Sequence, residues 1–156
     1  MDLPADLRLA LSNELATIPQ KSMAAAVAQL SARYRSVSAV GDTYLRNPTD
    51  VLAYAAYRLP ATFAAIFATL AEVSKRQPYW QPRTLLDAGA GPGTAMWAAS
   101  ETWPSMQHCT LLEREMAMIS MGNQLASHAR SVAVRQAQWR RVDLLSGWES
   151  APHDLV

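Results

Sequence analysis

The stretch LLDAGAGPGT, residues 85–94, decides the fold of this chain. Two apolar residues and an acid read as the end of a buried strand, and three glycines at alternate positions follow. Such glycines let the backbone turn tightly, and a helix beginning at Thr94 would aim the positive end of its dipole at the turn. A strand, a glycine-rich turn and a helix in this order are typical of a loop that binds a nucleotide cofactor.

The spacing of the glycines narrows the class of cofactor. Gly89, Gly91 and Gly93 lie two, four and six residues after Asp87, whereas the dinucleotide fingerprint G-x-G-x-x-G would require its third glycine at position 94. No Gly-Lys-Ser/Thr follows, which excludes a P-loop. The pattern resembles the first motif of Rossmann-like S-adenosylmethionine methyltransferases, whose cofactor carries an amino group and a sulfonium. A nicotinamide-dependent oxidoreductase and a purely structural turn are the alternatives.

A second acidic residue strengthens the prediction of a cofactor site. We expect a helix over 94–103 and a second parallel strand over 106–112 that ends at Glu113, 26 residues after Asp87. This separation is about one strand-helix-strand repeat, and a carboxylate at that place accepts hydrogen bonds from ribose hydroxyls. The alternative role of Glu113 is negative charge before a helix predicted over 115–129, and the two roles can coexist.

Two further strands are predicted toward the end of the chain. Residues 135–142 lead to Asp143, whose carboxylate would either meet an adenine amine or be a solvated turn residue. Residues 152–156 begin what reads as a fourth strand. Because the first strand is central in this fold class, we expect its edge at Leu85-Leu86 to lack a full partner, which would favour self-association through that edge.

The first half of the chain has helical rather than strand periodicity. Amphipathic helices are predicted over 4–18 and 21–35, and the apolar segment 49–75 is predicted to form two helices that meet at Leu59-Pro60. Arg58 and Pro60 interrupt that segment, which favours core helices over a membrane span. The domain prediction is therefore a helical region over 1–81 and a cofactor-binding half of a Rossmann-like domain over 82–156.

Composition adds a candidate RNA-facing stretch. The chain has 156 residues, of which 50% are hydrophobic and 17% charged, with a net charge of +1, as in a globular protein with no general preference for nucleic acid. The segment between Glu115 and Asp143 contains no acidic residue. Its basic residues are His128, Arg130, Arg135, Arg140 and Arg141. These side chains would either approach RNA phosphates or form a solvated face.

Other site chemistry is nearly absent from the sequence. Cys109 is the only cysteine, so an internal disulfide is excluded, and the three histidines lack metal-ligand spacing. We therefore predict no metal, and no residue is marked as catalytic. The segment that begins at Met1 lacks the basic and apolar regions of a signal peptide, which predicts a cytoplasmic protein.

Two segments together resemble a known family. The run YAAYRLPATF, residues 54–63, followed by LDAGAGPGTAMWAA, residues 86–99, resembles the small-ribosomal-subunit methyltransferase-like family over residues 47–156. The resemblance implies a class I methyltransferase-like fold, S-adenosylmethionine at the glycine loop, and association with ribosomal RNA or the small ribosomal subunit. The resemblance implies that Asp87 and the three loop glycines bind the cofactor. It implies the same role for Glu113, because of its position after the second predicted strand.

The chain departs from this family in two respects. Family members are longer, and several hold an iron–sulfur cluster on a group of cysteines that this chain lacks. We therefore expect the helical region and the cofactor half of a truncated α/β methyltransferase, inactive by itself, from a protein that methylates ribosomal RNA. The alternative is a non-catalytic small-subunit assembly or binding factor that retains the methyltransferase fold. No DNA or membrane partner is expected.

Overall fold

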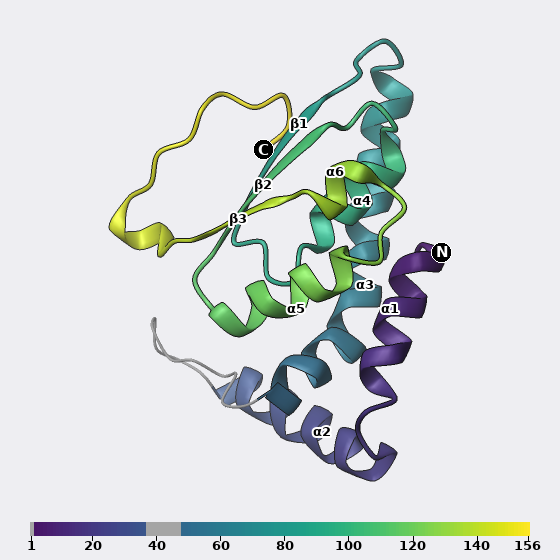
Figure 1. Ribbon diagram of the computed structural model, residues 1–156, viewed down its shortest axis with the longest axis vertical. Helices are drawn as coiled ribbons and strands as arrows, with labels where there is room; N and C mark the ends of the chain where they lie inside the picture. Colours follow the sequence, from purple (N-terminus) through teal and green to yellow (C-terminus); the bar gives the residue numbers. More distant parts are fainter. Residues whose placement is uncertain (1, 37–47) are drawn as a thin grey trace.

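The computed structural model describes residues 2–36 and 48–156. Three helices come first, and strands and helices then alternate along the chain (Figure 1). The elements are α1 (Ala5–Leu15), α2 (Gln20–Ser36), α3 (Pro48–Arg76), β1 (Thr84–Ala88), α4 (Thr94–Thr102), β2 (His108–Glu113), α5 (Met116–Ala126), α6 (Val132–Arg135), β3 (Gln138–Arg141) and the short 3-10 helix η1 (Leu144–Ser146).

The strands form one parallel sheet in the order β1-β2-β3. Leu85 lies opposite Cys109, and Leu111 lies opposite Trp139. These side chains share one face of the sheet and pack into the core with residues of the helices. Parallel strands joined by helices, with the glycine turn directly after β1, confirm the Rossmann-like class I methyltransferase fold, present in part.

The edge of β1, predicted to lack a full partner, is paired at one residue near the end of the sequence. The Leu86 N–H donates to the Leu155 carbonyl at 2.9 Å, and the Leu155 N–H donates to the Thr84 carbonyl at 3.1 Å. The pairing is parallel and consists of the single bridge between Leu85 and Leu155. The segment after β3 leaves the sheet and returns to β1, as Figure 1 shows in yellow.

The break predicted at Leu59-Pro60 is also wrong, because α3 is one helix with Pro60 inside it. A proline in a helix interior removes one backbone hydrogen bond and costs about 3 kcal/mol. Leu59 and Phe63, each only 1% exposed, are buried on either side of it in the core. Burying two such side chains contributes about 3–6 kcal/mol, which offsets the cost and keeps the helix continuous.

The N-terminal helices share their core with the sheet. Leu7 of α1 and Phe63 of α3 belong to the same buried cluster as Trp103 and Leu111. Within the described ranges, α3 is the helix whose length and composition would let it cross a membrane, and here it packs against α1, α2, α4 and α5.

Boundaries in the second half differ by a few residues from the prediction. The helix predicted to reach residue 129 ends at Ala126, and the strand predicted from residue 135 begins at Gln138. Between them lies α6, a single turn that the sequence did not indicate. Its N-terminus is capped by Ser131, whose side chain accepts a hydrogen bond from the Val134 N–H.

Candidate functional site

The glycine turn after β1 has the backbone that its sequence predicts. Gly89, Gly91 and Gly93 have φ values of 81°, 55° and 82°, a region that side chains disfavour. The N–H groups of Gly89 and Ala90 both donate to the Leu112 carbonyl, at 2.8 and 3.1 Å. These bonds hold the turn against the end of β2.

The three glycines have different surroundings. A Cβ at Gly91 would have no atom within 4 Å, whereas one at Gly93 would lie 3.1 to 3.2 Å from Met96, Leu111 and Trp139. Gly91 therefore borders open space that a ligand can enter, and Gly93 is needed for packing beneath the turn.

Gly122 of α5 also supports the turn, a role that was not predicted from the sequence. A Cβ on Gly122 of α5 would overlap the Trp139 ring and lie 3.2 Å from the Pro92 carbonyl oxygen in the turn. The Trp139 indole thus fits between two glycines, Gly93 and Gly122. The available signal was an isolated glycine within a helical pattern, which usually has a packing reason.

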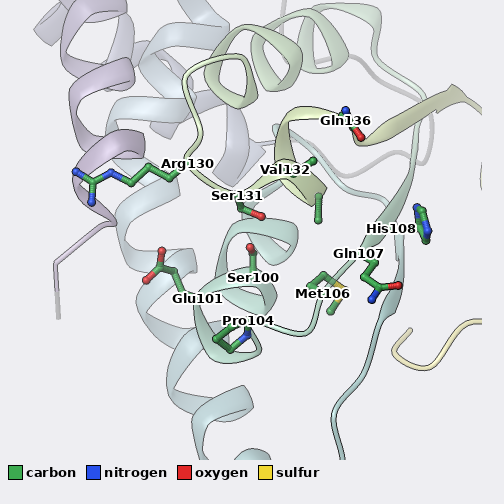
Figure 2. A pocket seen from close by; sticks show the side chains of 11 residues that line it. Ser100, Glu101, Pro104, Met106, Gln107, His108, Arg130, Ser131, Val132 and Gln136 are labelled. Carbon is green, nitrogen blue, oxygen red and sulfur yellow. The ribbon is translucent and has the colours of Figure 1, made fainter.

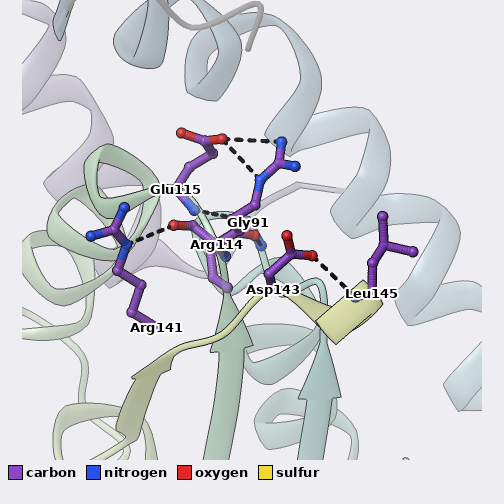
Figure 3. Close-up of polar contacts among 7 residues, drawn as sticks. Gly91, Arg114, Glu115, Arg141, Asp143 and Leu145 are labelled. Atoms are coloured by element: carbon purple, nitrogen blue, oxygen red, sulfur yellow. Dashed lines mark hydrogen bonds and ion pairs between the residues drawn. The ribbon is translucent and has the colours of Figure 1, made fainter. Parts of the chain in front are cut away.

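Glu113 bonds three backbone amides around the turn. Its Oε2 accepts from the Gly91 N–H at 2.8 Å, and its Oε1 accepts from the N–H groups of Arg114 and Glu115 at 2.7 and 2.8 Å. Figure 3 shows Gly91, Arg114 and Glu115 close together at the end of the strands, with the Arg114 side chain paired to Glu115. Glu113 therefore ties the glycine turn to the connection between β2 and α5.

Asp87 lies half-buried under the turn. Desolvation, and then the nearby charge of Glu113, raise the pKa of its carboxyl to about 6. Its Oδ2 is fully buried and has no hydrogen-bond partner. An acceptor in this state favours a positively charged or hydrogen-bond-donating group placed next to it.

A pocket of about 300 Å³ opens at the carboxyl ends of the strands. Each strand contributes to its wall: Gly89 follows β1, Glu113 ends β2, and Asp143 follows β3. Asp143 Oδ1 also accepts from the Leu145 N–H at 3.0 Å, so this carboxylate caps η1 (Figure 3). The crevice outside the carboxyl ends of parallel strands is where open α/β sheets bind ligands.

These residues fit a nucleoside cofactor that carries positive charge. The pocket presents the carboxylates of Glu113 and Asp143 together with apolar atoms of Leu112, Leu144 and Leu145. Carboxylates accept from ribose hydroxyls and from an exocyclic amine, and the apolar side chains suit a flat base. The unpartnered Asp87 oxygen and the open space at Gly91 lie next to the same turn. Arg114 also lines the pocket, and its guanidinium pairs with Glu115 at 3.2 Å.

Two of the arginines predicted to face RNA, Arg140 and Arg141, point to opposite faces of the sheet, because they are neighbours on β3. Each of three arginines donates to backbone carbonyls: Arg135 to Ala129 and Arg130, Arg140 to Glu149, and Arg141 to Arg114. These bonds give all three a local structural role.

A second cavity, of about 720 Å³, lies at the opposite end of the strands (Figure 2). The end of α4, the start of β2 and α6 form its wall, and its charged residues are Glu101 and Arg130. None of the residues predicted to bind the cofactor lines it. Among the residues that the structure describes, no group of three potential metal ligands occurs.

Comparison with known families gives a match over this same region. Residues 48–156 match the family described as "Mitochondrial small ribosomal subunit Rsm22". The chain belongs to this family. The match confirms the resemblance predicted from residue 47 onward; Asn47 itself lies outside the residues that the structure describes.

A human member and several solved structures are similar to the chain. "Ribosome assembly protein METTL17, mitochondrial" of Homo sapiens is 37% identical over 75 residues, which are 47% of this chain and 16% of the human protein. The chain thus spans a small part of that relative. The plantazolicin methyltransferase BpumL in complex with SAH aligns at a TM-score of 0.47 and 17% identity, over 84% of this chain and 45% of that one. Coclaurine N-methyltransferase, bound to N-methylheliamine and SAH, aligns at a TM-score of 0.46 and 12% identity. The alignment covers 96% of this chain and 48% of that one.

Proposed function

We propose that this chain is the cofactor-binding part of an S-adenosylmethionine-dependent methyltransferase that acts on RNA of the small ribosomal subunit in the cytoplasm. The observation that carries the proposal is the pocket in which Gly89, Glu113 and Asp143 meet at the ends of three successive strands. Membership of a family named for the small ribosomal subunit supports the choice of target.

Each residue has a defined part in holding the cofactor. Glu113 accepts from the ribose hydroxyls, Asp143 accepts from the adenine amine, and Asp87 offers its buried oxygen to the positively charged end. Gly91 leaves room for the ligand to approach the main chain. The bound cofactor supplies an electrophilic methyl group. Transfer of that group depends on holding donor and acceptor in line, which is what a rigid turn and pocket provide.

A second candidate is small-subunit assembly without methyl transfer. The human relative carries the name of a ribosome assembly protein, which favours this candidate. In that case the pocket would still bind the cofactor, because the fold around it is the same. The bound ligand would then stabilise the binding-competent structure rather than react.

Incubation with small ribosomal subunits and methyl-tritiated S-adenosylmethionine tests the proposal. We expect the 156-residue chain to sediment with the subunits but to transfer no label by itself, and a longer version of the protein that includes the acceptor side to place the label in RNA. Glu113→Ala should weaken cofactor binding and reduce the label in proportion. Sedimentation and cofactor binding without any label from the longer version would select the assembly function. Absence of both subunit association and cofactor binding would contradict the two candidates together.

A further inference from the structure

The turn between α3 and β1, residues 75–83, presents one aromatic side chain almost wholly to solvent. Tyr79 is 97% exposed, more than any other large apolar or aromatic side chain that the structure describes. The turn lies at the top of the view in Figure 1, at the end of the strands away from the candidate cofactor pocket. It therefore has no part in the site described above.

The residues around Tyr79 hold its backbone in a fixed position. Trp80 packs edge-on against Trp103, with ring centroids 5.2 Å apart and an angle of 73° between the rings. The Trp80 N–H also donates to the Gln77 carbonyl at 3.1 Å. Pro78 precedes Tyr79, and Pro82 is fully buried. A backbone that is already held in place loses little conformational entropy when a partner binds there.

Basic residues flank Tyr79 in the chain. Residues 73–86 contain three basic side chains and no acidic one. Glu72 faces this group and pairs with Arg76 at 3.0 Å, with Lys75 further away at 3.9 Å. Asp154 also faces it, and its Oδ2 accepts from the backbone N–H groups of Arg83 and Thr84. With both acids counted the group has a net charge of +1, and Lys75 and Arg83 remain exposed.

An exposed aromatic ring between exposed cations is the arrangement that binds single-stranded nucleic acid. The ring stacks on a base, and the cations neutralise neighbouring phosphates. The cavity of Figure 2 lies at the same end, since Gln107 and His108 in its wall both donate backbone hydrogen bonds to the Arg83 carbonyl. Its charged residues, Glu101 and Arg130, cancel, so the cavity adds no net charge.

We propose that the 75–83 turn is a contact site for single-stranded RNA, with a base stacked on Tyr79 and the flanking phosphates paired with Lys75 and Arg83. This inference rests on the proposed function, which supplies an RNA target. It adds a contact surface that lies at the far end of the sheet from the cofactor.

Fluorescence anisotropy with labelled oligouridine tests this site, with an RNA duplex of equal charge as the second probe. We expect Tyr79→Ala to weaken oligouridine binding by about 5- to 100-fold and to change duplex binding little, because only unpaired bases can stack. Tyr79→Trp should keep wild-type affinity. Tyr57→Ala, at another exposed tyrosine on α3, is the matched control and should also keep it. The double variant Lys75→Gln/Arg83→Gln should flatten the dependence of log K on log salt by about 0.7 for each phosphate that is no longer neutralised.

The inference would be overturned if wild type and Tyr79→Ala bound oligouridine with equal affinity. It would also be overturned if the wild-type protein sedimented with small subunits but did not bind oligouridine. Neither result would affect the proposed function, which is tested separately by cofactor binding and by sedimentation with intact subunits. A third outcome would contradict the proposed function alone. In that case the protein would not bind S-adenosylhomocysteine, while Tyr79→Ala would still weaken oligouridine binding.

Discussion

The carboxylate of Glu113 and the backbone N–H of Gly91 are joined by a hydrogen bond of 2.8 Å that connects the end of β2 to the middle of the glycine turn. The bond places an acceptor beside the position where a ligand would approach the main chain. It also links the two halves of the predicted cofactor site, which lie 22 residues apart in the chain.

Replacing Glu113 should disturb both the turn and the ligand. We expect Glu113→Ala to weaken S-adenosylhomocysteine binding by about 1–3 kcal/mol, because the ribose hydroxyls lose a charged acceptor. Amide exchange at Gly91, followed by NMR, should accelerate in the same variant. Glu101→Ala, an acid at the far end of the strands, is the control. Unchanged affinity and unchanged exchange at Gly91 would exclude Glu113 from the site.

The raised pKa of Asp87 predicts a dependence of stability on pH. In the folded state this pKa is about 6, above its ordinary value of 3.8, so between about pH 4 and pH 6 the folded protein binds more protons than the unfolded chain. Stability contributed by the protonated acid is therefore lost as pH rises through this window, by up to about 3 kcal/mol. Asp87→Asn should remove this component and be the more stable protein at pH 7, as measured by urea unfolding.

The control for this prediction is Asp2→Asn, at an exposed acid far from the turn along the chain. Parallel stability curves for wild type and Asp87→Asn between pH 4 and pH 7 would show that Asp87 is not held in a strained, buried state. Asp87→Asn should also bind the cofactor more weakly, because a neutral amide cannot pair with a cation.

Gly122→Ala should destabilise the protein although alanine is the better helix former. In an open helix this change stabilises by up to about 1 kcal/mol. Here the new methyl group would overlap the Trp139 ring and approach the Pro92 carbonyl, so we expect a net loss of about 1–3 kcal/mol in the free energy of unfolding. In a Trp139→Leu background the loss should shrink. A double-mutant cycle without coupling between the two positions would refute the predicted overlap.

Gly91 provides a test of the open space beside the turn. Asparagine tolerates positive φ better than other side chains do, so Gly91→Asn should fold while its side chain occupies the space for the ligand. We expect a melting temperature close to that of wild type and a loss of S-adenosylhomocysteine binding of tenfold or more, about 1.4 kcal/mol. Full affinity in Gly91→Asn would make the turn structural only.

Asp154 should stabilise the pairing of Leu155 with β1. Its Oδ2 accepts from two backbone amides and the Thr84 hydroxyl, and these bonds lower its pKa. The stabilisation is present above the unfolded pKa, near 4, and is lost as pH falls through the lower folded value. Asp154→Ala should therefore speed amide exchange at Leu86 and Leu155 at neutral pH. Exchange as slow as in wild type would show that the pairing with β1 does not depend on this carboxylate.

The sequence predicted the parts of the site that are local in the chain. The turn from Asp87 to Gly93 is a short motif whose backbone requirements are visible in the residue types, and Glu113 follows at the length of one repeat. The sequence could not show that Glu113 accepts a hydrogen bond from Gly91, because that bond depends on the register between β1 and β2. The role of Trp139 between Gly93 and Gly122 is hidden for the same reason.

The errors came from tertiary packing that overrides local preference. Pro60 is a helix breaker by local chemistry, yet burial of Leu59 and Phe63 keeps α3 continuous. The prediction that β1 lacks a full partner at Leu85-Leu86 did not include the single bridge that Leu155 makes with Leu85. The Asp154 carboxylate, bonded to Thr84, aligns Leu155 with β1.

The central claim is that the pocket at the carboxyl ends of the strands binds S-adenosylmethionine rather than a dinucleotide. Isothermal titration calorimetry of the 156-residue chain with S-adenosylhomocysteine, and separately with NAD, tests it most directly. We predict one site for S-adenosylhomocysteine, with affinity reduced in Glu113→Ala, and NAD binding at least about tenfold weaker, or 1.4 kcal/mol. Tighter binding of NAD than of S-adenosylhomocysteine would contradict the claim.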